Sequence, residues 1–251
     1  DGQKLTPLIK DFSVMAEQTS SKFQLPTTQH SIGGFYASIS NYVFGDMDDV
    51  GKLMGLAPFG KSGIYNFDAF EFDSRRLLVK DDWKHHFNNP SQGYEYFKEH
   101  FDYYADVAKW AQEQVEKAVI NCIKNRVEQF PNENLCYSGG VALNAVANAK
   151  LEDLNLVKNL YIEPAAADNG LALGCAFYGW LQYLKKQKIA HDGSTCFGKN
   201  YTKDDVNKAF VSSDEFSKIE FNNEDELLIY CAKKLNEGKT IAWFQSGSEF
   251  G

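Results

Sequence analysis

The 251-residue sequence predicts an α/β fold in which helices flank a sheet with at least some parallel strand pairing. Strand-like and helix-like segments alternate in the second half: a strand at 135–137, a helix from about 142, a strand at 160–162 and a helix from about 169 to 186. Just before them, residues 103–130 carry one apolar stripe with most charges off it. This pattern is typical of a long amphipathic helix that covers a sheet, and Pro131 ends it.

The first hundred residues predict shorter elements. Apolar residues recur at helical spacing within 31–45, and 49–63 predicts a short helix broken by Gly55 and followed by a loop. Partial alternation within 65–82 predicts a small hairpin. The polar and aromatic segment 83–100 predicts a loop with a short helix.

The last fifty residues predict two helices and a final strand. The segments 202–210 and 223–240 have helical patterns, and Asn223 or Asp225 is a candidate N-cap of the second helix because both side chains accept hydrogen bonds from a helix start. Residues 240–246 predict a strand.

Composition narrows the class of protein. The 34 acidic residues outnumber the 26 basic ones, so a protein that binds the phosphate backbone of nucleic acid is disfavoured. No apolar run reaches about 18 residues, so no membrane span is expected. The five cysteines contain no CxxC pair, which argues against zinc fingers and disulfide frameworks and favours a cytoplasmic protein. Cys136 and Cys175 lie in apolar runs and are predicted to be small core residues.

The first candidate site is Ser138-Gly139-Gly140, which follows a predicted strand and precedes a predicted helix. Glycines there let a ligand approach the first N–H groups of the helix, which makes an anion site. Glycine also serves a tight turn with unusual dihedral angles. The pattern alone leaves these two interpretations evenly balanced.

Two groups of acidic residues are further candidates. Asp168 stands at the second strand-to-helix junction, where the pattern favours a helix cap over a ligand for a divalent metal. The run Asp46, Asp48 and Asp49 precedes Lys52 and is either a solvated face or a site for ribose hydroxyls. The helix after Asp168 has glycines that indicate close packing or a ligand lying across them, namely Gly170, Gly174 and Gly179.

Read in order, several stretches resemble the O-carbamoyltransferases of the nodulation and antibiotic-tailoring type. They are HSIGGFYASISNYVFG (30–45), GKLMGLAPFG (51–60), YSGGVALNAVANAKL (137–151) and IEPAAADNGLALGCAF (162–177). The final IAWFQSGSEFG (241–251) is similar to the start of the family's next motif. The chain begins at Asp1 without a Met, and we expect it to be a piece of a longer protein.

The resemblance implies a fold and an activity. Residues 1–195 would be the second lobe of an actin-like (ribonuclease-H-like) domain with a mixed sheet flanked by helices. Residues 196–251 would be a linker and the start of an α+β adenylate-forming domain. In such a protein, carbamoyl-adenylate made from ATP and carbamoyl phosphate passes its carbamoyl group to a hydroxyl of a small-molecule acceptor, and a divalent metal, iron, is bound. We expect neither nucleic acid nor membrane among its partners, and we expect this piece alone to be inactive.

The resemblance also assigns residues. The nucleotide-binding turn would be Ser138, Gly139, Gly140 and Val141, with Asn144 one helical turn further on. Asp168 matches the family's aspartate metal ligand. The resemblance therefore favours a metal ligand over a helix cap at this position, although one residue can serve as both. Asp1 would be a second metal ligand. Asp48, Asp49 and Lys52 align with the stretch that touches ribose. The family's His-x-x-x-His pair does not occur in this chain, so the metal site would be half present.

Three alternatives remain open. A threonylcarbamoyl transferase of tRNA modification shares the fold, but the net charge of -8 argues against it. A sugar kinase of the same fold would transfer phosphate from ATP instead. A nucleotide-binding module that has lost catalysis would bind without turnover.

Overall fold

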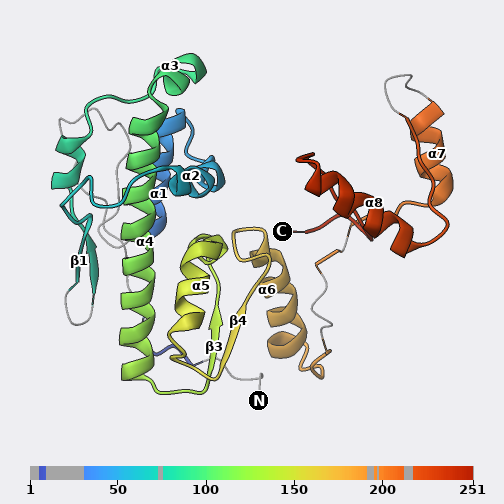
Figure 1. The fold of residues 1–251 in the computed structure, drawn as a ribbon. Helices are drawn as coiled ribbons and strands as arrows, with labels where there is room; N and C mark the ends of the chain where they lie inside the picture. Colours follow the sequence, from blue (N-terminus) through green and yellow to red (C-terminus); the bar gives the residue numbers. More distant parts are fainter. Residues whose placement is uncertain are drawn as a thin grey trace. The chain divides into compact units, whose positions relative to one another are not determined.

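The computed structural model describes residues 6–9, 31–72, 76–190, 195–196, 198–211 and 217–250 (Figure 1). The chain folds into two compact units, Asp1–Lys188 and Ile189–Gly251. Each unit is described separately below.

The first two helices in the described part of unit 1 correspond to segments with a predicted helical pattern. Helix α1 (Ile32–Phe44) starts where the Ser31 hydroxyl accepts a hydrogen bond from the Gly34 N–H at 2.8 Å. Helix α2 (Val50–Leu56) leads directly into the 3-10 turn η1 (Ala57–Phe59). The predicted break at Gly55 is therefore wrong. Burial of Leu53 and Leu56 on one face holds the helix together despite the cost of about 1 kcal/mol that a helical glycine carries.

The hairpin is confirmed, and an aromatic core lies beside it. Strand β1 (Phe70–Phe72) pairs antiparallel with β2 (Leu77–Val79), and the turn η2 (Asp82–His86) and helix α3 (Tyr94–Glu99) follow. The Phe35 ring of α1 lies edge-on to Trp83 at 5.1 Å and to Trp110 at 5.6 Å between ring centroids. All three side chains are buried. Burial of large rings dominates the energetics of a core, so residues far apart in sequence are joined here.

Helix α4 (Phe101–Gln129) confirms the long predicted helix and organises unit 1. It contacts α1, α2, η1 and α5 as well as strand β1 (Figure 1). Its buried face therefore covers a layer of helices more than the sheet that we expected.

Beyond α4 the chain forms the predicted α/β unit. Strand β3 (Asn134–Tyr137) pairs parallel with β4 (Asn159–Ile162), in the register Cys136 opposite Tyr161. Helix α5 (Ala145–Asp153) lies between these strands in sequence. Helix α6 (Gly170–Tyr178) follows β4 and continues as a π-helical turn, η4 (Gly179–Tyr183). The α/β class is confirmed, and the described residues form two separate two-stranded sheets, one parallel and one antiparallel.

The prediction that Cys136 and Cys175 are core residues is wrong, because both are exposed. Side chains alternate along a strand. Leu135 and Tyr137 of β3 are half-buried, which leaves Cys136 on the opposite, open face. Cys175 lies on α6, where none of the described side chains is buried.

Unit 2 contains helices α7 (Lys203–Val211) and α8 (Glu224–Asn236), both predicted. The Asn223 Oδ1 accepts a hydrogen bond from the Glu226 N–H at 2.9 Å, so Asn223 is the N-cap. The predicted strand at 240–246 is wrong: in the described part of unit 2 the single strand-like pairing is a bridge between Asn200 and Gly247. A strand needs a neighbour for its backbone groups. No described helix of the chain is both long and apolar enough to cross a membrane.

Candidate functional site

In the glycine turn after β3, Gly139 and Gly140 have different structural settings. Gly139 has a φ of 107°, a conformation that residues with side chains rarely adopt, and its N–H donates to the Ala166 carbonyl at 2.9 Å. The chain then forms the 3-10 turn η3 (Gly140–Leu143), so the helix predicted from about 142 begins only at Ala145. As the first amides of a helical turn, the N–H groups of Gly140 and Val141 have no acceptor within it.

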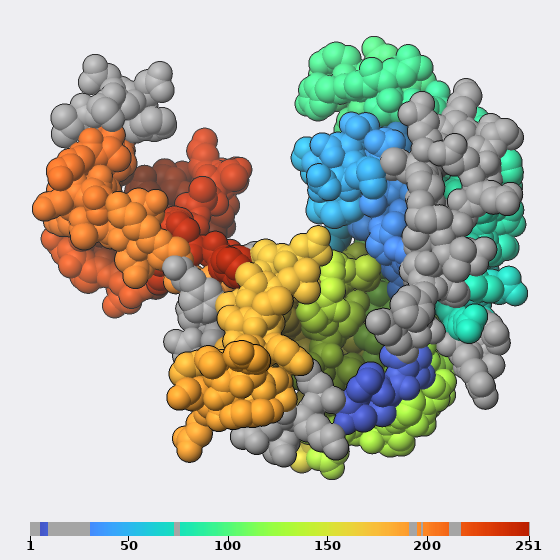
Figure 2. Space-filling view, turned by 180° about the vertical axis from the view of Figure 1, so that it is seen from behind, coloured from blue at the N-terminus to red at the C-terminus, as the bar shows by residue number. Residues whose placement is uncertain are grey.

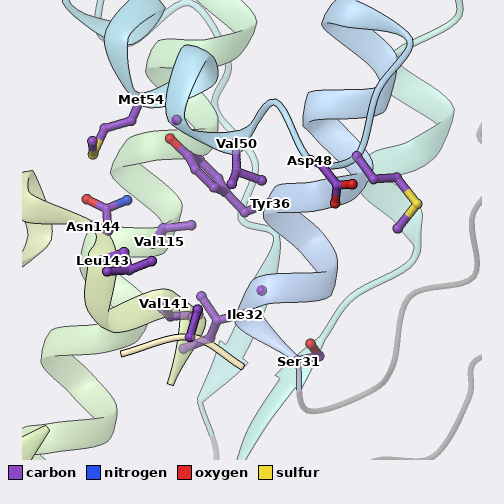
Figure 3. A pocket seen from close by; sticks show the side chains of 15 residues that line it. Ser31, Ile32, Tyr36, Asp48, Val50, Met54, Val115, Val141, Leu143 and Asn144 are labelled. Carbon is purple, nitrogen blue, oxygen red and sulfur yellow. The ribbon is translucent and has the colours of Figure 1, made fainter. Parts of the chain in front are cut away.

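A pocket of about 780 Å³ opens beside this turn (Figure 3). Ligand pockets commonly have volumes of about 300–1,000 Å³. The residues that line this pocket come from the start of α1, the segment joining α1 to α2, helix α2, η3 and the loop after β4. The space-filling view shows these blue, green and yellow segments next to one another on one face of unit 1 (Figure 2).

The pocket wall is mostly apolar, with polar groups at a few points. Apolar side chains come from each of the main walls, namely Ile32, Met47, Val50, Met54, Val115, Val141 and Leu143. The polar contributors are Ser31, Tyr36, Asp48 and Asn144. Such a surface suits a flat, partly apolar ligand that carries a few polar atoms.

Contacts between elements hold η3 and the adjoining Asn144 in place at the pocket. A Cβ on Gly33 would lie 3.5 Å from Val141 Cγ2, so the start of α1 lies close against η3. Asn144 caps α5 by accepting the Ala147 N–H at 3.0 Å. The side-chain amides of Gln112, on α4, and Asn144 form two hydrogen bonds: Gln112 Nε2 donates to Asn144 Oδ1 at 2.9 Å, and Asn144 Nδ2 donates to Gln112 Oε1 at 3.0 Å.

Residues 8–177 match the family model described as carbamoyltransferase N-terminus. The chain belongs to this carbamoyltransferase family.

Relatives of this chain include two nodulation proteins. NolO of Bradyrhizobium diazoefficiens is 25% identical over 88% of this chain, and the match covers 41% of NolO. NolNO of Sinorhizobium fredii is 26% identical over 88% of this chain and 33% of its own length. An uncharacterized protein of Synechocystis is 28% identical over 88% of this chain and 40% of its own length. The chain thus spans about two fifths of the length of the first relatives that it matches.

The structure brings together part of the predicted nucleotide-binding set. Gly140, Val141, Asn144 and Asp48 all line the one pocket, although they come from two regions about ninety residues apart. Ser138 and Gly139 lie just before it, and the Ser138 hydroxyl donates to the Ala166 carbonyl at 3.4 Å.

The other two residues of the predicted ribose stretch lie outside the pocket lining. The Asp49 carboxylate and the Lys52 ammonium group form an ion pair at 2.7 Å at the start of α2. Asp48 is the residue of this stretch that lines the pocket, and its backbone N–H donates to the Asp46 carboxylate at 2.8 Å.

Of the two predicted metal ligands, Asp168 is the one that lies within the described residues. Asp168 is exposed in the loop after β4, next to Ala167, which lines the pocket. It is not the cap of α6 either, because Asn169 holds the N-cap position and makes no cap hydrogen bond. In the described ranges no three His, Cys, Asp or Glu residues are grouped to hold a metal ion. Asp1 lies outside those ranges.

Of the glycines after Asp168, one is explained by close packing. A Cβ on Gly170 would lie 2.0 Å from the Ala165 carbonyl oxygen, so only glycine fits there. Gly174 and Gly179 have open space around them.

Sequence reasoning missed Tyr36 and Gln112. Burial raises the pKa of the Tyr36 hydroxyl well above its ordinary value of 10.0, and the charge of Glu116 raises the pKa further. Tyr36 therefore stays protonated and donates to Gln112 Oε1 at 2.7 Å. The sequence pattern that could have identified Gln112 as buried is its spacing: it lies one helical turn from Ala108 and next to Ala111, on the buried face of α4.

Proposed function

We propose that this chain is part of a carbamoyltransferase that moves a carbamoyl group from carbamoyl-adenylate to a hydroxyl of a small-molecule acceptor. The observation that carries the proposal is the pocket where Gly140, Val141 and Asn144 meet the start of α1 in a chain of this family. The adenylate would be formed from ATP and carbamoyl phosphate.

The pocket suits the nucleotide part of the donor. The N–H groups of Gly140 and Val141 in η3 have no acceptor among the described residues. They would hold the phosphate, because the start of a helical turn favours negative charge. The apolar side chains of Val50, Met54 and Leu143 would contact the adenine ring. The carboxylate of Asp48 would accept hydrogen bonds from ribose hydroxyls.

The reaction would be an acyl transfer. The acceptor oxygen bonds to the carbamoyl carbon, and the bond between that carbon and the phosphate oxygen breaks, so that AMP leaves with the electron pair. The acceptor's proton passes to a base such as a carboxylate or water. The amides of η3 would stabilise the charge on the departing phosphate.

The described residues do not by themselves fit a bound iron. Asp168 supplies one exposed carboxylate, and the described residues contain no group of three or more His, Cys, Asp or Glu side chains that could hold a metal ion. We therefore assign no step of the reaction to a metal.

Binding of AMP to the 251-residue chain tests the proposal, and α2 provides a matched pair of variants. Gly51 lines the pocket and Gly55 does not, and a Cβ at either position meets no atom within 4 Å. Both Gly51→Leu and Gly55→Leu improve helix propensity. Calorimetry should show one AMP bound by the wild type and by Gly55→Leu, and at least tenfold weaker binding by Gly51→Leu. Absence of AMP binding to the wild type, or equal binding by both variants, would contradict the proposal.

A further inference from the structure

Behind the pocket, buried polar side chains form one continuous hydrogen-bonded network. Gln112 Oε1 accepts from the Tyr36 hydroxyl at 2.7 Å and from Asn144 Nδ2 at 3.0 Å. Gln112 Nε2 donates to Glu116 Oε1 at 3.0 Å and to Asn144 Oδ1 at 2.9 Å. Gln112 is 3% exposed, Glu116 5% and Asn144 7%. Buried amides of this kind are costly unless every group is bonded.

The two ends of the network determine which way both amides face. The Glu116 carboxylate, which is paired with Lys150, only accepts, so the nitrogen of Gln112 must face it. The oxygen of Gln112 then faces Tyr36 and the nitrogen of Asn144. At the other end the backbone N–H of Ala147 only donates, which requires the oxygen of Asn144 there.

One donor is left over. Gln112 uses both hydrogens of Nε2 and both acceptor positions of Oε1, and Asn144 Oδ1 accepts two bonds. The second hydrogen of Asn144 Nδ2 has no partner among the described residues. Asn144 lines the pocket, and Figure 3 shows the nitrogen end of its amide on the side of Tyr36 and Val50.

We infer that Gln112, which does not itself line the pocket, is a positioning residue that holds Asn144 with an N–H donor rather than a carbonyl toward the ligand. The ligand atom beside Asn144 is therefore an acceptor, a ring nitrogen or a hydroxyl or phosphoryl oxygen. The identity of this ligand as an adenylate rests on the proposed function. The orientation of the amide follows from the network alone.

A second buried glutamine on the same helix provides a matched control. Gln114 is 4% exposed and its Oε1 accepts the Ala69 N–H at 3.0 Å, away from the pocket lining. Gln112→Leu and Gln114→Leu each remove a buried amide and should both lower the midpoint of urea unfolding. By calorimetry, Gln112→Leu should weaken AMP binding about tenfold, and Gln114→Leu should leave it unchanged. Equal loss in both variants would overturn the inference.

A measurement without ligand separates this inference from the proposed function. In ¹⁵N spectra, the side-chain amide signals of Asn144 are identified by their loss in Asn144→Asp. In the wild type one hydrogen should exchange slowly, because it is bonded to Gln112, and in Gln112→Leu both should exchange fast. Unchanged Asn144 signals in Gln112→Leu would refute the positioning role even if AMP binds. If the wild type binds no AMP, the proposed function fails and the spectra still decide the role of Gln112. Gln112→Asn, too short to make both bonds, serves in place of Gln112→Leu if the latter does not fold.

Discussion

Replacing Gly60 by Ala should destabilise unit 1, because η1 crosses α4 at this glycine. An added Cβ would lie 2.0 Å from the Ala105 carbonyl oxygen, 2.5 Å from its carbon and 2.7 Å from Lys109 Cβ, whereas ordinary contacts begin at 3.4 Å. Ala105 is fully buried in the second turn of α4, where its backbone is held by the helix, so it cannot easily give way. The turn must therefore move off the helix by more than 1 Å, and α2, which forms a wall of the pocket, is continuous with it.

Overpacking of this kind costs about 1–3 kcal/mol, and we expect the upper half of that range because two of the three atoms are backbone. The entropy that the unfolded chain loses on Gly→Ala offsets only about 0.4–1 kcal/mol. Urea unfolding followed by the fluorescence of the buried Trp83 and Trp110 measures the difference within unit 1. Gly55→Ala is the control: its Cβ meets no atom within 4 Å, and it should stabilise by up to about 1 kcal/mol. A Gly60→Ala protein at least as stable as the wild type would refute the reasoning.

Three further outcomes follow from packing, capping and titration. Phe35→Ala should cost about 3–5 kcal/mol in the same urea assay, because the ring is fully buried between Phe70, Trp83 and Trp110; a loss below about 1 kcal/mol would contradict this. Asn223→Ala should lower the stability of α8 by about 1 kcal/mol, measured as lost helical ellipticity on heating. Burial raises the pKa of Tyr137 from 10.0 to about 12, so folding keeps its proton bound. This contribution is complete below pH 10 and is lost as the pH rises toward 12, so urea midpoints should fall between pH 10 and 11 but not between pH 8 and 9.

Elements governed by local patterns were predictable from the sequence. The α4 stripe, the hairpin, the parallel pair β3–β4 and the Asn223 cap each depend on spacing or on one side chain near a helix start. The predictions that failed depend on neighbours. Whether Gly55 ends a helix depends on the burial of Leu53 and Leu56, and whether Cys136 is buried depends on what covers the second face of β3.

The same distinction applies to the site. Asp48, Gly140, Val141 and Asn144 could be named from sequence because a known family pattern marks them, and the structure places all four on one pocket. Gln112 has no such mark, because a glutamine within a helix is usually solvated. Its role arises only in the folded chain, where α4 places it against Asn144, Tyr36 and Glu116. Two of these partners lie on other elements, so the spacing of residues along α4 cannot reveal them.

The adjacent glycines of the turn after β3 serve different purposes, which the sequence could not separate. Gly139 is required by the fold, because a φ of 107° strains any residue with a Cβ. Gly140 has no such φ, and a Cβ on it would meet no atom within 4 Å. Folding alone would therefore accept a side chain at 140 and gain from the lower entropy of the unfolded chain. Gly140 lines the pocket, and its backbone there carries no side chain, so what a glycine provides at this position is access for a ligand.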